Sequence, residues 1–332
     1  MINNITILKT ETLDPWWNLA VEEYLLNNVA DNQCILYLWQ NQNTVVIGRN
    51  QNPWRECRRE LLEKEGGFLA RRLSGGGAVF HDTGNLNFTF LMKKTDYDLK
   101  KQVSVILLAV KKLGIEAEMS GRNDLTVDGH KFSGNAFCFR KHNAYHHGTI
   151  LVSADFNKLA KYLQVSEEKM KSKGIESVQA RVINLNQLRP EMTINDMVIA
   201  LTEAFKEIYG GVLLPSEGVE NMNQDILKQL YNKYSSWEWR YGEVPKFDIE
   251  LNTRFPWGGL ELGVKLESGR IVDVTAYSDA MDAEIIEKLP IALKGVLFNS
   301  IDIYDAIIKI PYENSDSGIL MDIGKWIKEK EF

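Results

Sequence analysis

Residues 71–90 read RRLSGGGAVFHDTGNLNFTF, with three consecutive glycines at residues 75–77 between two stretches expected to be extended, residues 68–73 and 78–81. Glycine has no side chain to keep a ligand away from the backbone, and it adopts conformations closed to other residues. The backbone N–H groups of such a loop can hold an anion such as a phosphate. For three glycines alone, a hairpin with ordinary turn residues is an equally good interpretation.

The residues on either side of the glycines extend this pattern. Side chains alternate along a strand, so Arg71 and Arg72 should point in opposite directions and only one can enter a cleft. A second turn at residues 82–85 leads into a strand on which Leu86, Phe88 and Phe90 share one face. The stretch therefore predicts a glycine loop held between strands, with one arginine beside it.

The composition is that of a globular protein with a sizeable core. The 332 residues include 44% hydrophobic and 25% charged residues, and 45 acids against 39 bases give a net charge of −6. This balance argues against a nucleic-acid partner. The three cysteines are scattered without CxxC spacing, and we find neither a secretory signal nor an apolar run of about 20 residues. We therefore expect a cytoplasmic protein with no membrane partner.

Several elements can be predicted within residues 1–120. Residues 5–8 and 116–119 are expected to form strands, and residues 98–113 a helix. Residues 34–39 and 44–48 resemble the two strands of a hairpin around the polar turn 40–43. Residues 53–66 resemble one helix that begins at a proline and ends at a glycine. Asp14 is the expected N-cap of another helix, whose first residue is Pro15.

The helix that begins at Pro15 carries two adjacent acidic residues. Glu23 lies at the edge of an apolar stripe of helical period, and Glu22 precedes it. Acidic side chains are rarely buried, so solvent exposure is the expected position for both. A position for one of them in a ligand pocket is the less favoured alternative.

Residues 121–136, GRNDLTVDGHKFSGNA, form a second informative stretch. Asp128-Gly129 between two alternating segments is a strong hairpin signal, because both central positions of such a turn need positive φ. Strict alternation places Lys131, Ser133 and Asn135 on one face of the returning strand. That face suits the wall of a polar cleft, although periodicity alone favours a solvent-exposed hairpin.

Known catalytic motifs are absent from the sequence. There is no GxxxxGK[ST], no complete GxGxxG, no HExxH and no GxSxG. These absences argue against a P-loop ATPase, a Rossmann dehydrogenase, a zinc protease and an α/β-hydrolase. His142, His146 and His147 are close together, but i,i+4 spacing brings histidines together only on a helix and this region is expected to be strand. We therefore expect no structural metal. On a strand, His146 and His147 should point to opposite faces.

The second half of the chain predicts a change of domain. Helices are expected at residues 155–163, 167–173 and 194–209. An irregular aromatic stretch at residues 235–245 marks the expected boundary between a first domain (1–245) and a second (246–332). In the second, strands are expected at 247–251, 260–266 and 271–276, with helices at 282–293, 300–309 and 318–328. This pattern predicts a small α+β module.

Taken together, these strings resemble the lipoate–protein ligase family over essentially the whole chain. The resemblance rests on residues 14–23, 44–54, 71–90, 121–125, 128–137, 146–149 and 235–241. It implies an α+β protein: a biotin/lipoyl-ligase-like catalytic domain of mixed, largely antiparallel sheets with flanking helices, then a small accessory C-terminal domain. It also implies the reaction, in which ATP activates free lipoate to lipoyl-AMP, releasing pyrophosphate, and the lipoyl group passes to a lysine of an apo lipoyl domain.

The resemblance leaves some partners undecided. It does not choose between lipoate and octanoate as the preferred acid. It also does not choose between 2-oxoacid dehydrogenase E2 subunits and the glycine-cleavage H protein as acceptors. A domain movement between the two half-reactions is expected, with a hinge near residues 241–246.

Site residues follow from the match to the family's motifs. Lys131 matches the essential lysine, whose ammonium stabilises the charge that builds up as a carboxylate attacks the α-phosphate. The implied ATP and adenylate contacts are Arg72, Gly77, Ala78, Val79, Phe80, Asn123, Asp124 and Lys131. Asn123 and Asp124 are the implied ligands of Mg²⁺. The implied lipoate contacts are Glu22, Trp39, Arg72, Ser74, Gly75, Lys131 and His147, with Val46 as a further wall residue; His81 lines the site without an assigned role.

Three alternatives stay open. A transferase on the same fold would use a cysteine nucleophile and an acyl-carrier donor without ATP. Cys138 is the cysteine nearest the His-Gly pair, and as a lone cysteine in an apolar string it is expected to be packed. A silent lipoate-binding protein should have lost Lys131 or the glycine loop, and both are present. A biotin ligase should carry a GRGRxxR loop, which this chain lacks.

Overall fold

The structure, a computed structural model, describes residues 2–121, 123–163, 182–216, 218–241, 248–311 and 318–330. The chain divides into two units. The first unit contains Met1–Val46, Pro53–Arg71 and Val79–Arg240, and the second contains Ile47–Asn52, Arg72–Ala78 and Tyr241–Phe332. The helix expected at residues 167–173 and the boundary expected at 245/246 lie outside the described residues.

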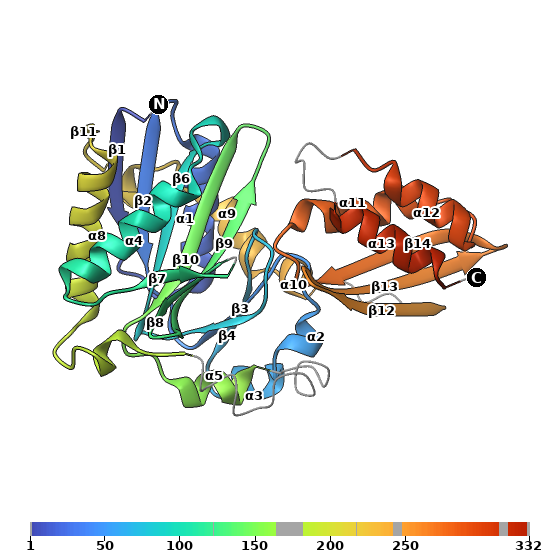
Figure 1. Cartoon of the computed structure of the whole chain (residues 1–332), viewed down its shortest axis with the longest axis horizontal. Coiled ribbons are helices and arrows are strands. Elements are labelled where there is room, and N and C mark those ends of the chain that lie inside the picture. The colour runs from blue at the N-terminus through green and yellow to red at the C-terminus, as the bar shows by residue number, and fades with distance from the viewer. Residues whose placement is uncertain are drawn as a thin grey trace. The chain divides into compact units, whose positions relative to one another are not determined.

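An eight-stranded sheet forms the frame of the first unit (Figure 1). In spatial order its strands are β11 (Val212–Leu213), β1 (Asn4–Lys9), β2 (Gln33–Trp39), β6 (Asn85–Lys93), β10 (Asn143–Leu151), β9 (His130–Phe139), β8 (Asp124–Val127) and β7 (Glu118–Ser120). β1 runs parallel to β2 and β11, whereas β2, β6, β10, β9, β8 and β7 pair antiparallel. The expected mixed, largely antiparallel sheet is confirmed.

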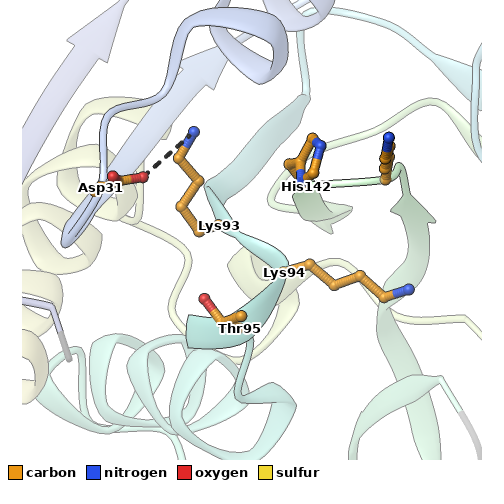
Figure 2. A pocket seen from close by; sticks show the side chains of 6 residues that line it. Asp31, Lys93, Lys94, Thr95 and His142 are labelled. Atoms are coloured by element: carbon orange, nitrogen blue, oxygen red, sulfur yellow. Dashed lines mark ion pairs between the residues drawn. The ribbon is translucent and has the colours of Figure 1, made fainter.

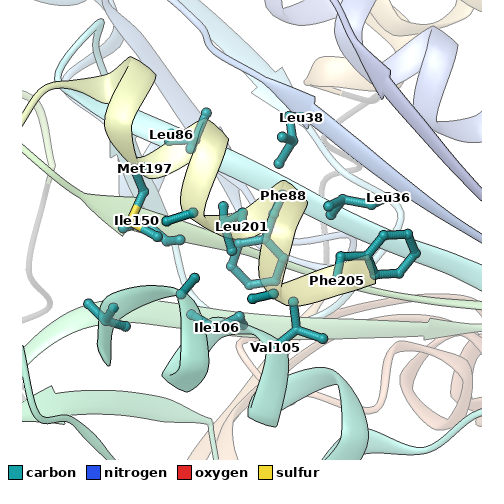
Figure 3. Close-up of a cluster of buried hydrophobic side chains, with 14 of the residues drawn as sticks. Leu36, Leu38, Leu86, Phe88, Val105, Ile106, Ile150, Met197, Leu201 and Phe205 are labelled. Atoms are coloured by element: carbon teal, nitrogen blue, oxygen red, sulfur yellow. The ribbon is translucent and has the colours of Figure 1, made fainter. Parts of the chain in front are cut away.

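Two amphipathic helices, α4 (Leu99–Lys112) and α8 (Ile194–Tyr209), cover one face of this sheet, which we call the core face. Their apolar sides pack on alternate residues of the central strands (Figure 3). The packed side chains include Leu36, Leu38, Leu86, Phe88, Phe90, Val105, Ile106, Ile150, Met197, Leu201 and Phe205. Helix α1 (Pro15–Asn28) contacts the opposite face, which we call the α1 face, and α9 (Gln224–Ser235) packs on α1. The intervening residues of the strands point toward this second face.

A three-stranded sheet, β4 (Phe68–Arg71), β3 (Thr44–Ile47) and β5 (Val79–His81), shows that the expected hairpin at residues 34–48 is wrong. β2 and β3 form at the expected residues but belong to different sheets. Both edges of β2 are already occupied, by β1 and β6, so β3 has no edge of β2 to pair with. The chain turns away at Asn43, which has a φ of +40°.

The single helix expected at residues 53–66 is two short helices, α2 (Pro53–Glu56) and α3 (Arg59–Lys64). The break falls where Cys57 forms a β-bridge with Leu163 and the Arg58 N–H donates to Tyr162 O. Tertiary pairing thus interrupts a locally favourable helix. The other elements in the described part of this unit are α5 (Phe156–Tyr162), α10 (Trp237–Arg240) and three 3₁₀ turns at Lys94–Asp96, Leu185–Gln187 and Val219–Asn221.

Local sequence signals predicted the start of α1 and the turn between β8 and β9 correctly. The Asp14 carboxylate accepts hydrogen bonds from two N–H groups of the first turn of α1, and Pro15 is the first helical residue. Asp128 and Gly129 have φ values of +49° and +77° and connect β8 to β9 as the hairpin signal predicts. No helix in the described part of the chain combines the length and apolarity needed to cross a bilayer.

The C-terminal part of the second unit has the expected α+β composition. The sheet β12 (Ile249–Phe255), β13 (Gly258–Glu267) and β14 (Arg270–Ser278) is antiparallel, with helices α11 (Ala283–Leu293), α12 (Ser300–Ile308) and α13 (Gly318–Lys328). Its core joins both kinds of element through Leu260, Leu262, Val264, Ile271, Ile285, Leu289, Ile303, Ile307, Ile323 and Ile327.

The glycine loop at residues 72–78 belongs to this second unit. The Gly76 N–H donates to Ala280 O at 2.9 Å, and a Cβ on Gly75 would lie 2.3 Å from the same oxygen and 2.6 Å from Met281 O. Such distances are far inside van der Waals contact, so only glycine fits at residue 75. By contrast, a Cβ on Gly77 would meet nothing within 4 Å.

We therefore expect Gly75→Ala to destabilise the second unit by about 1–3 kcal/mol, the usual cost of overpacking a filled site. The matched substitution Gly77→Ala should leave the free energy of unfolding unchanged, because its methyl group enters open space. Thermal unfolding of both variants measures the difference. Equal melting temperatures would show that the Gly75 contact with Ala280 and Met281 is not tightly packed in solution.

Candidate functional site

A β-bulge in β9 determines where the Lys131 side chain points. Leu125 of β8 pairs with Ser133 but Thr126 pairs with Lys131, so Phe132 is an extra residue in β9. A bulge of this kind turns two successive side chains to the same face. The expectation that Lys131 shares a face with Ser133 and Asn135 is therefore wrong, because strict alternation ends at the bulge.

Lys131 instead lies on the α1 face of the sheet. A Cβ on Gly134 would be 3.0 Å from Lys131 Nζ, so the ammonium lies directly over that residue. The ammonium is 2.7 Å from Asp124 Oδ1, and both side chains are about one third exposed, at 34% and 38%. The Gly134 N–H donates to Thr149 Oγ1 of β10 at 3.3 Å. A partly exposed cation beside a carboxylate is available to an anionic substrate.

Glu22 is fully buried, so its expected exposure is wrong. Its Oε1 accepts a hydrogen bond from Thr89 Oγ1 at 2.7 Å and lies 2.8 Å from His147 Nδ1. Trp39 Nε1 donates to the same Thr89 hydroxyl at 3.1 Å. The carboxylate is tolerated inside because hydrogen-bond donors on two strands of the sheet compensate its desolvation. Three predicted lipoate contacts, Glu22, Trp39 and His147, therefore meet in one network.

Glu23 is also buried, and its expected exposure is wrong as well. Its carboxylate receives hydrogen bonds from Arg140 at 2.7 Å, Lys233 at 2.7 Å and Tyr234 at 2.8 Å. Burial opposes ionisation, but the hydrogen bond and charge of Lys233, with Tyr234 and Arg140, outweigh it and hold the pKa of Glu23 below its ordinary value. The cluster joins α1 to α9 and to the end of β9.

We expect Glu23→Gln to lower the free energy of unfolding by about 2 kcal/mol at neutral pH, since two cations lose their counter-charge but remain partly exposed. A carboxylate with a lowered folded-state pKa stabilises the fold above the pKa of an unfolded glutamate. This stabilisation is lost as the pH falls through that value toward the folded-state pKa. Urea unfolding should thus show a smaller difference between variant and wild type at about pH 3.5.

The control for this experiment is Glu11→Gln, on a side chain that is 84% exposed beside Lys9. It should leave the unfolding free energy unchanged at both pH values. An equal effect of the Glu11 and Glu23 substitutions, or a difference that grows in acid, would contradict the assigned role of Glu23.

Further polar side chains line the α1 face next to this network. Asn87 of β6 accepts from Asn85 through its oxygen, and among the described residues its buried Nδ2 has no hydrogen-bond acceptor. In the same described part of the chain, Glu22 Oε2 is buried without a donor. The His81 ring packs edge-on to Trp39 at 6.2 Å, and its Nδ1 accepts from Asn41 Nδ2. Aromatic side chains beside the Asn87 and Glu22 polar atoms suit a ligand that has an apolar tail and a polar end.

The glycine loop is organised by Arg72 within the second unit. Arg72 Nε donates to Ser74 Oγ at 3.0 Å, and Nη2 donates to Gly75 O at 2.7 Å and Gly77 O at 2.8 Å. The guanidinium is buried and fixes the path of the loop through three hydrogen bonds. Its neighbour Arg71 donates to the carbonyls of residues 239 and 240 in the first unit, so the two guanidinium groups have different partners.

The residues that follow the loop enter the small sheet. Val79 pairs with Val46 and Phe80 with Val45, so both lie in regular β-structure. Phe80 and Val46 are buried. Their backbone groups are therefore held rigidly by β3, as expected for a segment that recognises a ligand through its main chain.

One open pocket in the first unit is separate from all these residues. It has a volume of about 490 Å³ and is lined by Asp31, Lys93, Lys94, Thr95, Lys141 and His142. Figure 2 shows the Lys93 ammonium turned toward Asp31, at 3.6 Å, while Lys94 extends in a different direction. The pocket contains no predicted site residue. It lies at the Lys93 end of β6, whereas Asn85 is the first residue of that strand.

Comparison with known proteins decides the family. Residues 14–206 match the model of the lipoyl protein ligase A/B catalytic domain, and residues 244–326 match the bacterial lipoate protein ligase C-terminus. The lipoate-protein ligase A of Psychrobacter cryohalolentis is 42% identical over 306 residues, which is 90% of each chain. This chain belongs to the lipoate–protein ligase family.

Solved structures of similar proteins agree with this family. P. falciparum LipL1, determined in complex with lipoate, superposes with a TM-score of 0.87 at 32% identity and covers 98% of this chain and 99% of its own. A lipoate-protein ligase A bound with ATP superposes with a TM-score of 0.63 at 25% identity, over 74% of this chain and 100% of its own. The fold of a biotin/lipoyl-ligase-like domain with a small C-terminal domain is confirmed.

The fold brings some of the predicted site residues together. It also places beside them residues that were not predicted from the sequence. In the first unit, Lys131 meets Asp124, Glu22 and Trp39 share the Thr89 hydroxyl, and His147 contacts the Glu22 carboxylate. Arg72, Ser74, Gly75 and Gly77 form the loop of the second unit. Thr89 and Asn87 were missed. Both are polar residues on a strand whose other face is wholly apolar, a pattern that could have indicated a second buried surface.

Proposed function

We propose that this chain activates free lipoate with ATP and transfers the lipoyl group to a lysine of an apo lipoyl domain. The observation that carries the proposal is the geometry of Lys131: the bulge at Phe132 turns its ammonium to the face that holds the Glu22–His147–Thr89 network. An ammonium has three N–H donors, so Lys131 can bind a substrate carboxylate or phosphate while it keeps its contact with Asp124. The ligase family and the lipoate and ATP in related structures support the same substrates.

In the first half-reaction, a lipoate carboxylate oxygen attacks the α-phosphorus of ATP, and the bond to the bridging oxygen of pyrophosphate breaks. Negative charge gathers on the phosphoryl oxygens, and the Lys131 ammonium stabilises it in place. We assign Arg72 and the backbone of residues 77–80 to the nucleotide. Glu22, Trp39, Ser74, Gly75 and His147 are assigned to lipoate, on the expected pattern of an apolar wall with few polar contacts.

In the second half-reaction, the amine of the acceptor lysine attacks the carbonyl carbon of lipoyl-AMP. The bond between that carbon and the AMP oxygen breaks, AMP leaves, and the amine releases a proton as the amide forms. The departing AMP carries a negative charge, so the same ammonium assists its departure. Lys131 itself is not acylated in this scheme.

We assign Mg²⁺ to Asp124 and Asn123, because a carboxylate and an amide offer the hard oxygen ligands that this ion prefers. When bound, the ion would neutralise phosphate charge. We also propose that residues 1–245 act as the lipoate- and ATP-binding domain and residues 246–332 as an accessory domain. The acceptors are lipoyl domains of 2-oxoacid dehydrogenase E2 subunits or the glycine-cleavage H protein, and octanoate is a second candidate acid.

The test uses the full chain with lipoate and ATP but without any acceptor protein. Mass spectrometry should detect lipoyl-AMP, with pyrophosphate released in equal amount, and both should disappear when EDTA removes Mg²⁺. Octanoate and biotin are run in parallel, and biotin should give no adenylate. Binding of lipoate without formation of adenylate would instead indicate a silent binding protein.

A further inference from the structure

His146 lies at the centre of a buried polar chain on the core face. Its Nδ1 is 3.0 Å from Gln102 Oε1 in α4, and its Nε2 is 2.8 Å from Asn135 Oδ1 in β9. His146 and Gln102 are fully buried, and Asn135 is nearly so. The rings of Phe88 and Phe90 pack against the imidazole at centroid distances of 5.4 and 5.8 Å. Polar contacts in such apolar surroundings are strong and costly to break.

Asn135 connects this chain to the corner that precedes β8. Its backbone N–H and its side-chain Nδ2 both donate to Asn123 O, at 3.0 and 2.9 Å, and Asn123 Nδ2 donates back to Asn135 O at 3.1 Å. The next residue is Asp124, whose carboxylate meets Lys131 Nζ on the α1 face. A continuous set of contacts therefore leads from the buried imidazole to the ammonium assigned to the reaction.

The protonation state of His146 follows from its two partners. Both ring nitrogens face amide oxygens, whereas a neutral imidazole has only one N–H to donate. Burial lowers the pKa of His146 to about 3, so the ring is neutral at neutral pH. One of the two side-chain amides, that of Gln102 or that of Asn135, must therefore be rotated by 180° so that its nitrogen faces the ring in place of its oxygen. Asn135 cannot turn, because its Nδ2 donates to Asn123 O. Gln102 can turn at a lower cost, because its Nε2 donates at 3.2 Å to Met92 Sδ and sulfur is a weak acceptor.

We propose that His146 is a positioning residue of the ligase site. As the Nε2–H tautomer it donates to the Asn135 amide, and Asn135 holds the 123–124 corner so that Asp124 meets Lys131. The Gln102 amide donates to the Nδ1 of the same ring and fixes the tautomer. The kinetic part of this proposal rests on the proposed function, whereas the tautomer does not.

Two variants of similar polarity separate positioning from simple packing. In His146→Gln the side-chain amide reaches the position of Nε2 and can still donate to Asn135, whereas in His146→Asn it reaches only the position of Nδ1. We expect His146→Asn to lower kcat for lipoyl-AMP formation about tenfold, as a displaced catalytic group does. The KM for lipoate should not change, and His146→Gln should stay within about threefold of wild type. The proposal would be overturned if the two variants had equal activities. It would also be overturned if the loss of activity appeared as a higher KM for lipoate and not as a lower kcat.

Nitrogen-15 NMR of the wild-type chain tests the tautomer without any substitution. The His146 ring should give the pattern of a neutral Nε2–H imidazole throughout the range from about pH 6 to 8. An Nδ1–H tautomer or an imidazolium in that range would overturn the proposal even if both variants failed to fold. If the wild type makes no lipoyl-AMP, the proposed function fails while the NMR result still decides the geometry around His146.

Discussion

Replacement of Lys131 by alanine should lower the rate of lipoyl-AMP formation by at least about a hundredfold, the usual cost of removing one fixed group that stabilises transition-state charge. The bulge at Phe132 orients this ammonium toward the α1 face, and a distance of 2.7 Å to Asp124 shows that it already holds an anionic oxygen. Single-turnover measurement of adenylate, with substrates saturating, isolates the chemical step. The loss should be in kcat and not only in KM.

The matched control is Lys111→Ala, on an exposed lysine of α4 that pairs with Glu116. It removes the same charge from the chain and should leave the rate unchanged. Lys131→Ala should unfold at nearly the wild-type temperature, because the side chain is about one third exposed and its ion pair contributes little. A Lys131→Ala enzyme with wild-type kcat would exclude this lysine from the reaction.

Replacement of Arg72 by alanine should lower kcat/KM for ATP by about a hundredfold, since a lost charge-assisted contact and a disordered loop act together. Arg72 donates to Ser74 Oγ, Gly75 O and Gly77 O, so the variant loses every one of these restraints on the glycine loop. Arg72→Lys should recover little of the activity, because an ammonium cannot reproduce the planar fork of a guanidinium. Steady-state kinetics with ATP varied at saturating lipoate measures the effect.

Arg270→Ala provides the control in the same unit. Arg270 is an exposed residue of β14, and its guanidinium donates to the Gly295 carbonyl at 3.0 Å. Its removal should change kcat/KM for ATP by less than about twofold, as surface substitutions usually do. If Arg72→Ala binds and uses ATP as well as Arg270→Ala does, then Arg72 has only a structural role.

Features determined by neighbouring residues could be predicted from the sequence. The N-cap at Asp14, the hairpin turn at Asp128-Gly129 and the apolar face of β6 all depend on residues that are adjacent in the chain. The glycine loop was also predicted, because three glycines in succession allow backbone conformations that are closed to other residues. The reason that Gly75 must be glycine lies in Ala280 and Met281, about two hundred residues away.

Features that depend on distant partners could not be predicted in this way. Glu22 and Glu23 look like surface residues until the strands and helices that carry His147, Lys233 and Tyr234 are in place. The direction of Lys131 depends on one extra residue in a strand pair, and no side-chain alternation reveals it. The family motifs predicted Glu22 and Lys131 as site residues, but only the fold explains how this buried carboxylate and this lysine come to lie on one face of the sheet.

The most direct test of the account is the intact mass of an apo lipoyl domain after incubation with this chain, ATP, Mg²⁺ and free lipoate. The acceptor should gain the mass of one lipoyl group. This gain should require ATP, and it should be absent with Lys131→Ala. A gain that needs no ATP and comes only from an acyl-carrier donor would contradict it, and would point to a cysteine-dependent transferase instead.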